Sequence, residues 1–171
     1  MRHPDIAELL REAMMLQVRV EERALIPDLC GFYWDENRTI MLNDCLSEWQ
    51  YRCTLCHELV HAKHRDSGCG LVGAKGERRA RKETALRLVD PIEYASAEAA
   101  YDGDMFLIAS ELGVTVQVIN DYRMWLDNNV RGLTRGRTDE DWNTRSRYRG
   151  RDWGFDDGAE PVRLRHAEGG A

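Results

Sequence analysis

The segment from His57 to His61 constrains this chain more than any other, because it places two histidines and a glutamate in the pattern HExxH. If the segment is helical, imidazoles four residues apart lie on one face of the helix and can bind a single zinc ion. Glu58 then lies beside them, where a carboxylate can act as a general base toward water. Because the pattern fixes only three positions, the surrounding sequence has to support it.

The sequence around the motif predicts a packed helix. Residues 49–64 contain neither Pro nor Gly, and Ser47 and Glu48 are suited to open a helix there. An apolar stripe lies opposite the histidines and consists of Leu55, Cys56, Leu59 and Val60. We therefore expect this helix to bury its stripe and to present His57 and His61 to a cleft.

Composition sets the outer limits. With 171 residues, 43% of them hydrophobic, the chain is long enough for one domain with a substantial core. The net charge of −6 argues against a surface that is generally attracted to nucleic acid. No apolar run approaches ~18 residues, and Asp5, Glu8 and Glu12 stand where a signal peptide would be hydrophobic. We expect a soluble, cytoplasmic protein with no membrane partner.

The elements before the motif predict an α+β fold. Apolar residues recur at helical spacing over residues 5–17, which indicates an amphipathic helix. Short strand-like runs follow at 18–20, 29–34 and 38–42, and turn-forming residues separate the last two. We expect a small antiparallel sheet that packs on the HExxH helix and leads the chain directly into it.

The elements after the motif supply candidates for a third metal ligand. Residues 66–76 contain four glycines and predict a loop, and a second helix is expected over 77–90, closed by Pro91. A three-ligand zinc site needs one more donor, and Glu77 and Glu83 on this helix are the contenders. Glu77 falls on the helix stripe that would face the core and the metal, whereas Glu83 projects away from it. Glu77 is therefore the preferred ligand.

Five cysteines open two competing interpretations of the same region. Residues 53–57 match CxxCH, the attachment pattern of haem c, but that chemistry normally requires export. A structural zinc site would need a second CxxC or a separate histidine pair, and neither is present. We favour free thiols in a reducing compartment. The five cysteines are Cys30, Cys45, Cys53, Cys56 and Cys69.

The C-terminal third divides into a helical part and a charged tail. Helices are expected over 92–101 and over 104–128, with a break at Gly113 that gives the spacing of a helix-turn-helix. The second helix of that motif carries one cation and one acid, which makes DNA a less favoured partner. We place a domain at 1–130 and a flexible charged tail at 131–171, where arginines alternate with acids and few aliphatic residues occur.

Taken together, these motifs resemble the ImmA/IrrE family of zinc metallopeptidases, the IrrE N-terminal-like domain, over about residues 31–126. The resemblance rests on the small sheet, on residues 52–61, and on a helix of the form Glu77-x-x-Ala80 with Leu88 near its end. It implies a zincin-like fold in which Glu77 is the third zinc ligand and Glu83 is a neighbouring or solvated residue. It also implies cleavage of a regulatory protein, such as a phage or mobile-element repressor.

The expected function is zinc-dependent peptide-bond hydrolysis. The metal ligands would be His57, His61 and Glu77, and Glu58 would be the catalytic base. The oxyanion-stabilising group stays open among His64, Tyr51, Tyr94 and Tyr101. The alternative is a helix-turn-helix DNA-binding or protein-interaction module in which the metal site is structural or vestigial.

Overall fold

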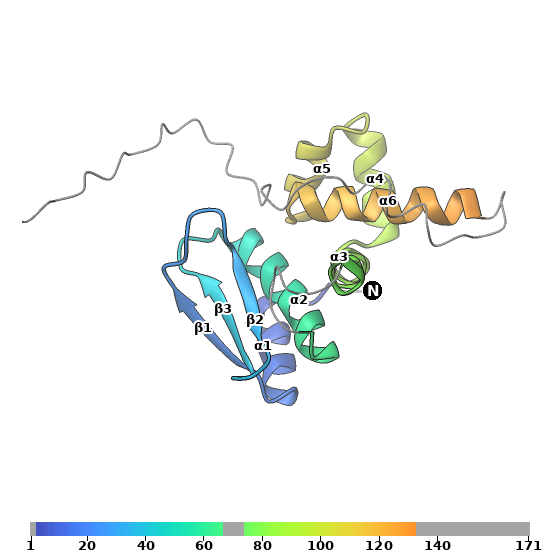
Figure 1. Cartoon of the computed structure of the whole chain (residues 1–171). Coiled ribbons are helices and arrows are strands. Elements are labelled where there is room, and N and C mark those ends of the chain that lie inside the picture. The colour runs from blue at the N-terminus through green and yellow to red at the C-terminus, as the bar shows by residue number, and fades with distance from the viewer. Residues whose placement is uncertain (1–2, 67–73, 133–171) are drawn as a thin grey trace, which may run out of the picture.

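The structure is a computed structural model that describes residues 3–66 and 74–132. The described residues form an α+β fold with a three-stranded sheet and six helices (Figure 1). In chain order the elements are α1 (Ile6–Met15), β1 (Arg19–Arg23), β2 (Gly31–Trp34), β3 (Thr39–Asn43), α2 (Glu48–His64), α3 (Ala74–Leu88), α4 (Pro91–Ala100), α5 (Met105–Leu112) and α6 (Val116–Gly132).

The sheet is mixed, so the expectation of an antiparallel sheet was wrong for one strand pair. The strand order is β1-β3-β2, in which β3 pairs antiparallel with β2 and parallel with β1. Burial explains the order: Ile40 and Leu42 of β3 are fully buried, whereas most of β1 is exposed. The apolar strand takes the centre and the charged strand takes an edge, because a central strand has less access to water.

Gly31 permits the close approach of β2, β3 and α2. A Cβ atom at this position would lie 2.7 Å from the Met41 carbonyl oxygen and 2.9 Å from Cγ2 of Thr54. Any larger residue would push the sheet away from α2. The glycine therefore sets how closely the HExxH helix packs on the sheet.

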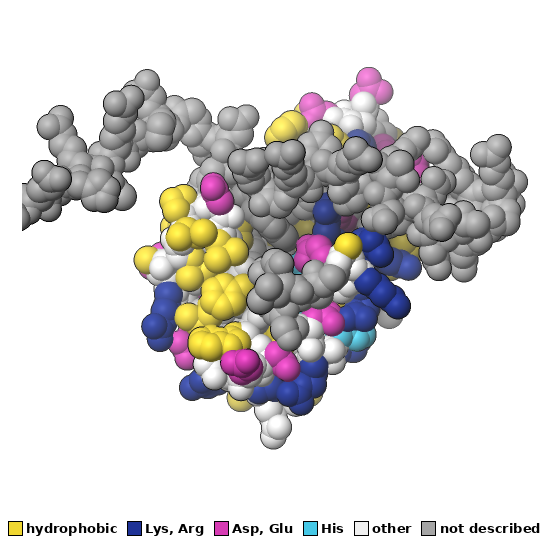
Figure 2. Space-filling view, viewed as in Figure 1, with side chains coloured by type: hydrophobic (Ala, Val, Ile, Leu, Met, Phe, Trp, Pro, Cys, Tyr) yellow, Lys and Arg dark blue, Asp and Glu magenta, His cyan; other side chains and the backbone are white. Residues whose placement is uncertain are grey.

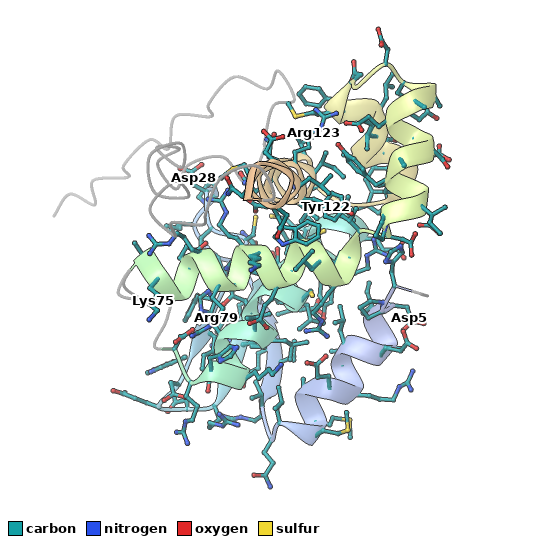
Figure 3. All side chains as sticks on the ribbon, turned by 90° about the vertical axis from the view of Figure 1, so that its right-hand side faces the viewer. Asp5, Asp28, Lys75, Arg79, Tyr122 and Arg123 are labelled. Atoms are coloured by element: carbon teal, nitrogen blue, oxygen red, sulfur yellow. The ribbon has the colours of Figure 1, made fainter. Side chains whose placement is uncertain are left out.

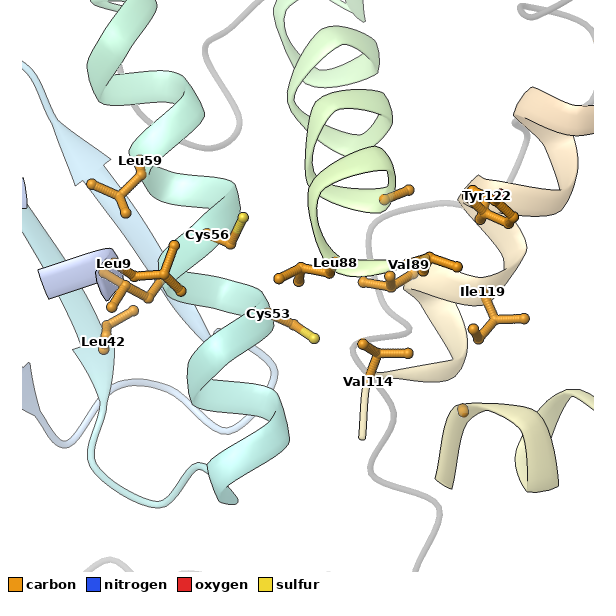
Figure 4. Packing of buried hydrophobic residues seen from close by; sticks show 14 of the residues in the cluster. Leu9, Leu42, Cys53, Cys56, Leu59, Leu88, Val89, Val114, Ile119 and Tyr122 are labelled. Atoms are coloured by element: carbon orange, nitrogen blue, oxygen red, sulfur yellow. The ribbon is translucent and has the colours of Figure 1, made fainter. Parts of the chain in front are cut away.

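The helices form two groups on either side of α3. Helices α1 and α2 cover one face of the sheet, and α3 lies between α2 and the group of α4, α5 and α6 (Figure 1). One continuous apolar core runs through both groups. Figure 4 shows Leu9, Leu42 and Leu59 between the sheet and α2, and Leu88, Val89 and Ile119 where α3 meets α6.

Helix boundaries differ from the predicted ones mainly around α3. This helix begins at Ala74 and therefore includes Gly76, which the sequence had assigned to the glycine-rich loop. Residues 67–73 of that predicted loop lie outside the described part of the chain. Further along, Gly113 ends α5 in the left-handed conformation, with φ 58°, as the predicted break requires.

Helix α6 ends slightly beyond the predicted domain boundary. Helix α6 continues to Gly132, just past the predicted boundary at 130, and residues 133–171 of the predicted tail (131–171) lie outside the described residues. Hydrophobic side chains gather on the sheet side of the molecule (Figure 2). Two large hydrophobic residues of the sheet region are exposed: Trp34 in β2, and Ile26 between β1 and β2. Among the described helices, none combines the length and the apolar character that a membrane crossing requires.

Candidate metal centre

The two motif histidines lie in the C-terminal half of α2. Ser47 caps the helix: its hydroxyl accepts a hydrogen bond from the Gln50 amide, and the Gln50 side chain accepts one from the Ser47 amide. Against the expectation of an open cleft, the central part of the helix is buried all round. His57 and Glu58 are each 2% exposed, and His61 is fully buried. Buried polar groups of this kind need partners.

Helix α3 brings a carboxylate to the histidines. The Nε2 atoms of His57 and His61 are 3.1 Å apart, and Oε2 of Glu77 lies 3.5 Å from the first and 3.4 Å from the second. Among the described residues, these three form the one group of three or more His, Cys, Asp or Glu side chains whose ligand atoms lie close enough together to hold a metal ion. Glu77 is 40% exposed, so the cluster reaches solvent on the Glu77 side.

The separations fit a tetrahedral metal ion. Zinc bonds to imidazole nitrogen and carboxylate oxygen are about 2.0–2.2 Å long, which holds tetrahedral donors about 3.3–3.5 Å apart. The three observed separations of 3.1–3.5 Å are close to that range. Two imidazoles and one carboxylate are also a donor set that zinc accepts, with a fourth position left for water or substrate.

The charges in the cluster reinforce one another. Burial alone would lower the pKa of His57, but the hydrogen bond with Glu77 and the negative charges of Glu58 and Glu77 outweigh it and raise that pKa. Burial would raise the pKa of Glu77, yet hydrogen bonds with both histidines and their charges hold it far below its usual value. Glu77 is therefore ionised and in the state required of a metal ligand.

Comparison with known families agrees with this geometry. The Peptidase_M78 family model, described as the IrrE N-terminal-like domain, matches residues 16–122, which is more than half of the chain. The chain belongs to this family. The family is of the metallopeptidase type, as the resemblance had implied. Searches of curated proteins and of solved structures returned no match.

Glu83 occupies a different place from Glu77 on α3. Its Oε1 lies 3.2 Å from Nε2 of His64, at the end of α2 and away from the cluster of three. Of the two contenders, only Glu77 is brought to the histidines. The sequence analysis preferred Glu77 because it falls on the core-facing stripe of this helix. Ala80 and Thr84 of that stripe are indeed buried.

The cysteines of α2 are separate from the metal cluster. Cys53 and Cys56 are both fully buried as free thiols, and Cys56 packs in the core near Leu59 and Leu88 (Figure 4). Within the part of the chain that the structure describes, they join no metal-binding group. Cys69 lies outside the described residues.

The candidates for oxyanion stabilisation have other partners. The Tyr94 hydroxyl donates to Glu98 and accepts from Arg123, and the Tyr101 hydroxyl donates to Glu111. His64 is paired with Glu83. Tyr51 interacts with Glu22, which contributes to raising its pKa after the larger effect of burial. Each of the four side chains thus has a partner outside the three-residue cluster.

One residue near the cluster was not singled out from the sequence. Oδ2 of Asp66 lies 3.4 Å from Nδ1 of His61, on the side of the ring away from Glu77. The only signal in the sequence was its position five residues after His61. Residues at this spacing come into contact here because α2 ends between them and the chain turns back.

Proposed function

We propose that this chain is a zinc-dependent endopeptidase of zincin-like form, with His57, His61 and Glu77 as the metal ligands. The observation that carries the proposal is the convergence of two imidazole Nε2 atoms and one carboxylate oxygen from two helices within 3.1–3.5 Å of one another. Membership of a metallopeptidase family supports the same activity. Zinc is preferred over other metals because the donor set matches its ordinary ligands.

Hydrolysis at this site requires a bound metal ion and a residue that transfers protons. A zinc ion bound here would supply a Lewis acid that polarises the peptide carbonyl and lowers the pKa of water. Glu58 accepts the proton of the attacking water and delivers it to the departing amine, so that one carboxylate serves both as general base and as general acid. Glu58 follows the ligand His57 directly, and its burial in α2 excludes bulk water from the carboxylate.

The proposed substrate is a regulatory protein, such as a phage or mobile-element repressor. This part of the proposal rests on the resemblance to the ImmA/IrrE family. The proposed setting is the cytoplasm, where such a regulator acts.

A helix-turn-helix DNA reader is a weaker alternative. The segment 115–123 contains a single cation, Arg123, which donates to the Tyr94 hydroxyl at 2.7 Å and to the Gly103 carbonyl at 2.8 Å. Its single acid, Asp121, is buried against Arg81. Side chains held in this way give little attraction for phosphate, and Ile119 and Tyr122 are used in the core.

The Glu58→Gln variant tests the proposed mechanism. The amide keeps the shape of the side chain but cannot accept a proton. We therefore expect normal metal content and at least a 100-fold loss in the rate of cleavage of the repressor substrate, because a general base ordinarily contributes that much to the rate. The measurement is cleavage by purified protein with zinc, with a chelator, and after zinc is restored. Undiminished cleavage by Glu58→Gln would remove this residue from the mechanism.

A further inference from the structure

The two nitrogens of the His61 ring face different environments. Nε2 faces His57 and Glu77, whereas Nδ1 faces Asp66 at 3.4 Å. Within the described residues, Nδ1 makes no hydrogen bond, and the Asp66 carboxylate is the charged group that approaches it. Because His61 is fully buried, water does not offer Nδ1 an easy substitute partner. The carboxylate of Asp66 is therefore the natural acceptor for a proton on Nδ1.

The end of α2 folds Asp66 back onto His61. Arg65 adopts the left-handed conformation, with φ 55°, and its amide donates to the Ala62 carbonyl. The Asp66 amide then donates to the His61 carbonyl at 3.0 Å. These two bonds form a Schellman motif, which closes the helix and reverses the chain. As a result, the backbone and side chain of Asp66 both lie against the same histidine.

Helix α3 holds the Asp66 carboxylate from the other side. Arg79 donates a hydrogen bond to Oδ2 of Asp66 at 2.5 Å, and Figure 3 shows Arg79 on the side of α3 that faces α2. This contact holds the Asp66 carboxylate beside the His61 ring. Arg79 lies two residues after Glu77, so α3 supplies both a candidate ligand and the support for Asp66.

We infer that Asp66 is a positioning residue that accepts the Nδ1 proton of His61 and so directs the unprotonated Nε2 atom toward the metal. The inference rests on the proposed metal site and adds a residue to it. A carboxylate behind a ligating imidazole fixes the ring and its tautomer and makes Nε2 a better donor. Arg79 completes the chain of contacts from α3 through Asp66 to His61.

Zinc affinity of Asp66 variants tests the inference. Removing such a support ordinarily costs a 10- to 100-fold loss of metal affinity, so we expect Asp66→Ala to lose about that much in competition with a chromogenic chelator. Asp66→Asn keeps an acceptor oxygen and should recover part of the loss. Glu83→Gln is the matched control, because it alters a carboxylate beside His64, and it should bind zinc like the wild type. Wild-type affinity in Asp66→Ala would overturn the inference.

A spectroscopic measurement on the wild type keeps the test independent of folding defects. In zinc-loaded protein, long-range ¹H–¹⁵N spectra should place the ring proton of His61 on Nδ1, and a proton on Nε2 would overturn the inference. If wild type binds zinc but Asp66→Ala keeps wild-type affinity, or the His61 proton lies on Nε2, only this inference fails and the proposed function stands. A wild type that binds no zinc would overturn the proposed function and this inference together.

Discussion

At the scale of single residues, the closeness of the two imidazoles limits their protonation. Their Nε2 atoms are 3.1 Å apart, and two N–H groups pointing at each other over that distance would repel. Without a metal, a proton between them is stabilised by the ionised Glu77, as the raised pKa of His57 indicates. A zinc ion would replace that proton, which explains why metal binding should weaken as the solution becomes more acidic.

The buried thiols give the folded state a distinct dependence on alkaline pH. Burial is the largest cause that raises the pKa of Cys56 to about 12 and that of Cys30 to about 11, from an ordinary 9.0. Above about pH 9 the unfolded chain releases these protons while the folded chain keeps them. Their contribution to stability is therefore complete below pH 9 and falls progressively as the pH rises to about 11–12.

Urea unfolding of Cys56→Ala and wild type across this pH range measures the effect. We expect the variant to lose stability less steeply between pH 9 and 11, since it lacks one of the ionising thiols. Ser96→Ala is the control, because Ser96 is exposed and carries no group that ionises in this pH range, so the slope should stay unchanged. Equal slopes for wild type and Cys56→Ala would contradict the buried-thiol account.

The candidate ligands could be predicted from the sequence, but Asp66 could not. His57 and His61 follow from helical spacing, and Glu77 follows from the stripe that it shares with Ala80. Asp66 depends on a left-handed residue at 65, where helices usually have Gly and this chain has Arg. Local sequence therefore gave no sign that the helix would end by folding back on His61.

At the scale of elements, the contact between α3 and α6 contains a buried ion pair. Arg81 donates to both carboxylate oxygens of Asp121 at 2.6–3.0 Å, and Gln117 adds a further donor at 3.1 Å. Asp121 is almost completely buried. Figure 3 shows Tyr122, the next residue, between the same two helices. The pair therefore lies at the junction that fixes α3, and with it Glu77, relative to the C-terminal helices.

Breaking this pair should cost more than replacing it. Asp121→Leu leaves Arg81 without its acceptor, and we expect a loss of about 3 kcal/mol in the free energy of unfolding. The double variant Arg81→Met, Asp121→Leu removes both charges and should recover most of that loss. Chemical denaturation of both single variants and of the double variant forms a double-mutant cycle. Simple addition of the two single effects would contradict a coupled pair.

The elements were predicted better than the way they pair. Capping residues and glycines located the helices to within a few residues, because these signals act over one or two turns. The parallel pairing of β1 with β3 depends on which strand is buried at the centre of the sheet. Strands that short can be ordered in several ways, and only packing against α2 selects one.

At the scale of the whole molecule, α3 connects the two halves of the fold. It contacts α2 through Glu77, the residues just after α2 through Arg79, and α6 through Arg81. The sequence favoured a packing role for the segment after Gly113, and the burial of Ile119 and Tyr122 agrees with that interpretation. The position of Glu77 thus depends on residues from both halves of the fold.

Metal analysis of purified protein shows whether His57, His61 and Glu77 bind zinc. Protein purified from a reducing cytoplasm should contain about one zinc ion per chain, and the double variant His57→Ala, His61→Ala should contain none. Glu77→Gln should lose most of its zinc, whereas Glu83→Gln should keep it, because only Glu77 lies 3.4–3.5 Å from both histidines. Well-folded wild type without zinc, or equal zinc in wild type and the histidine double variant, would contradict the account.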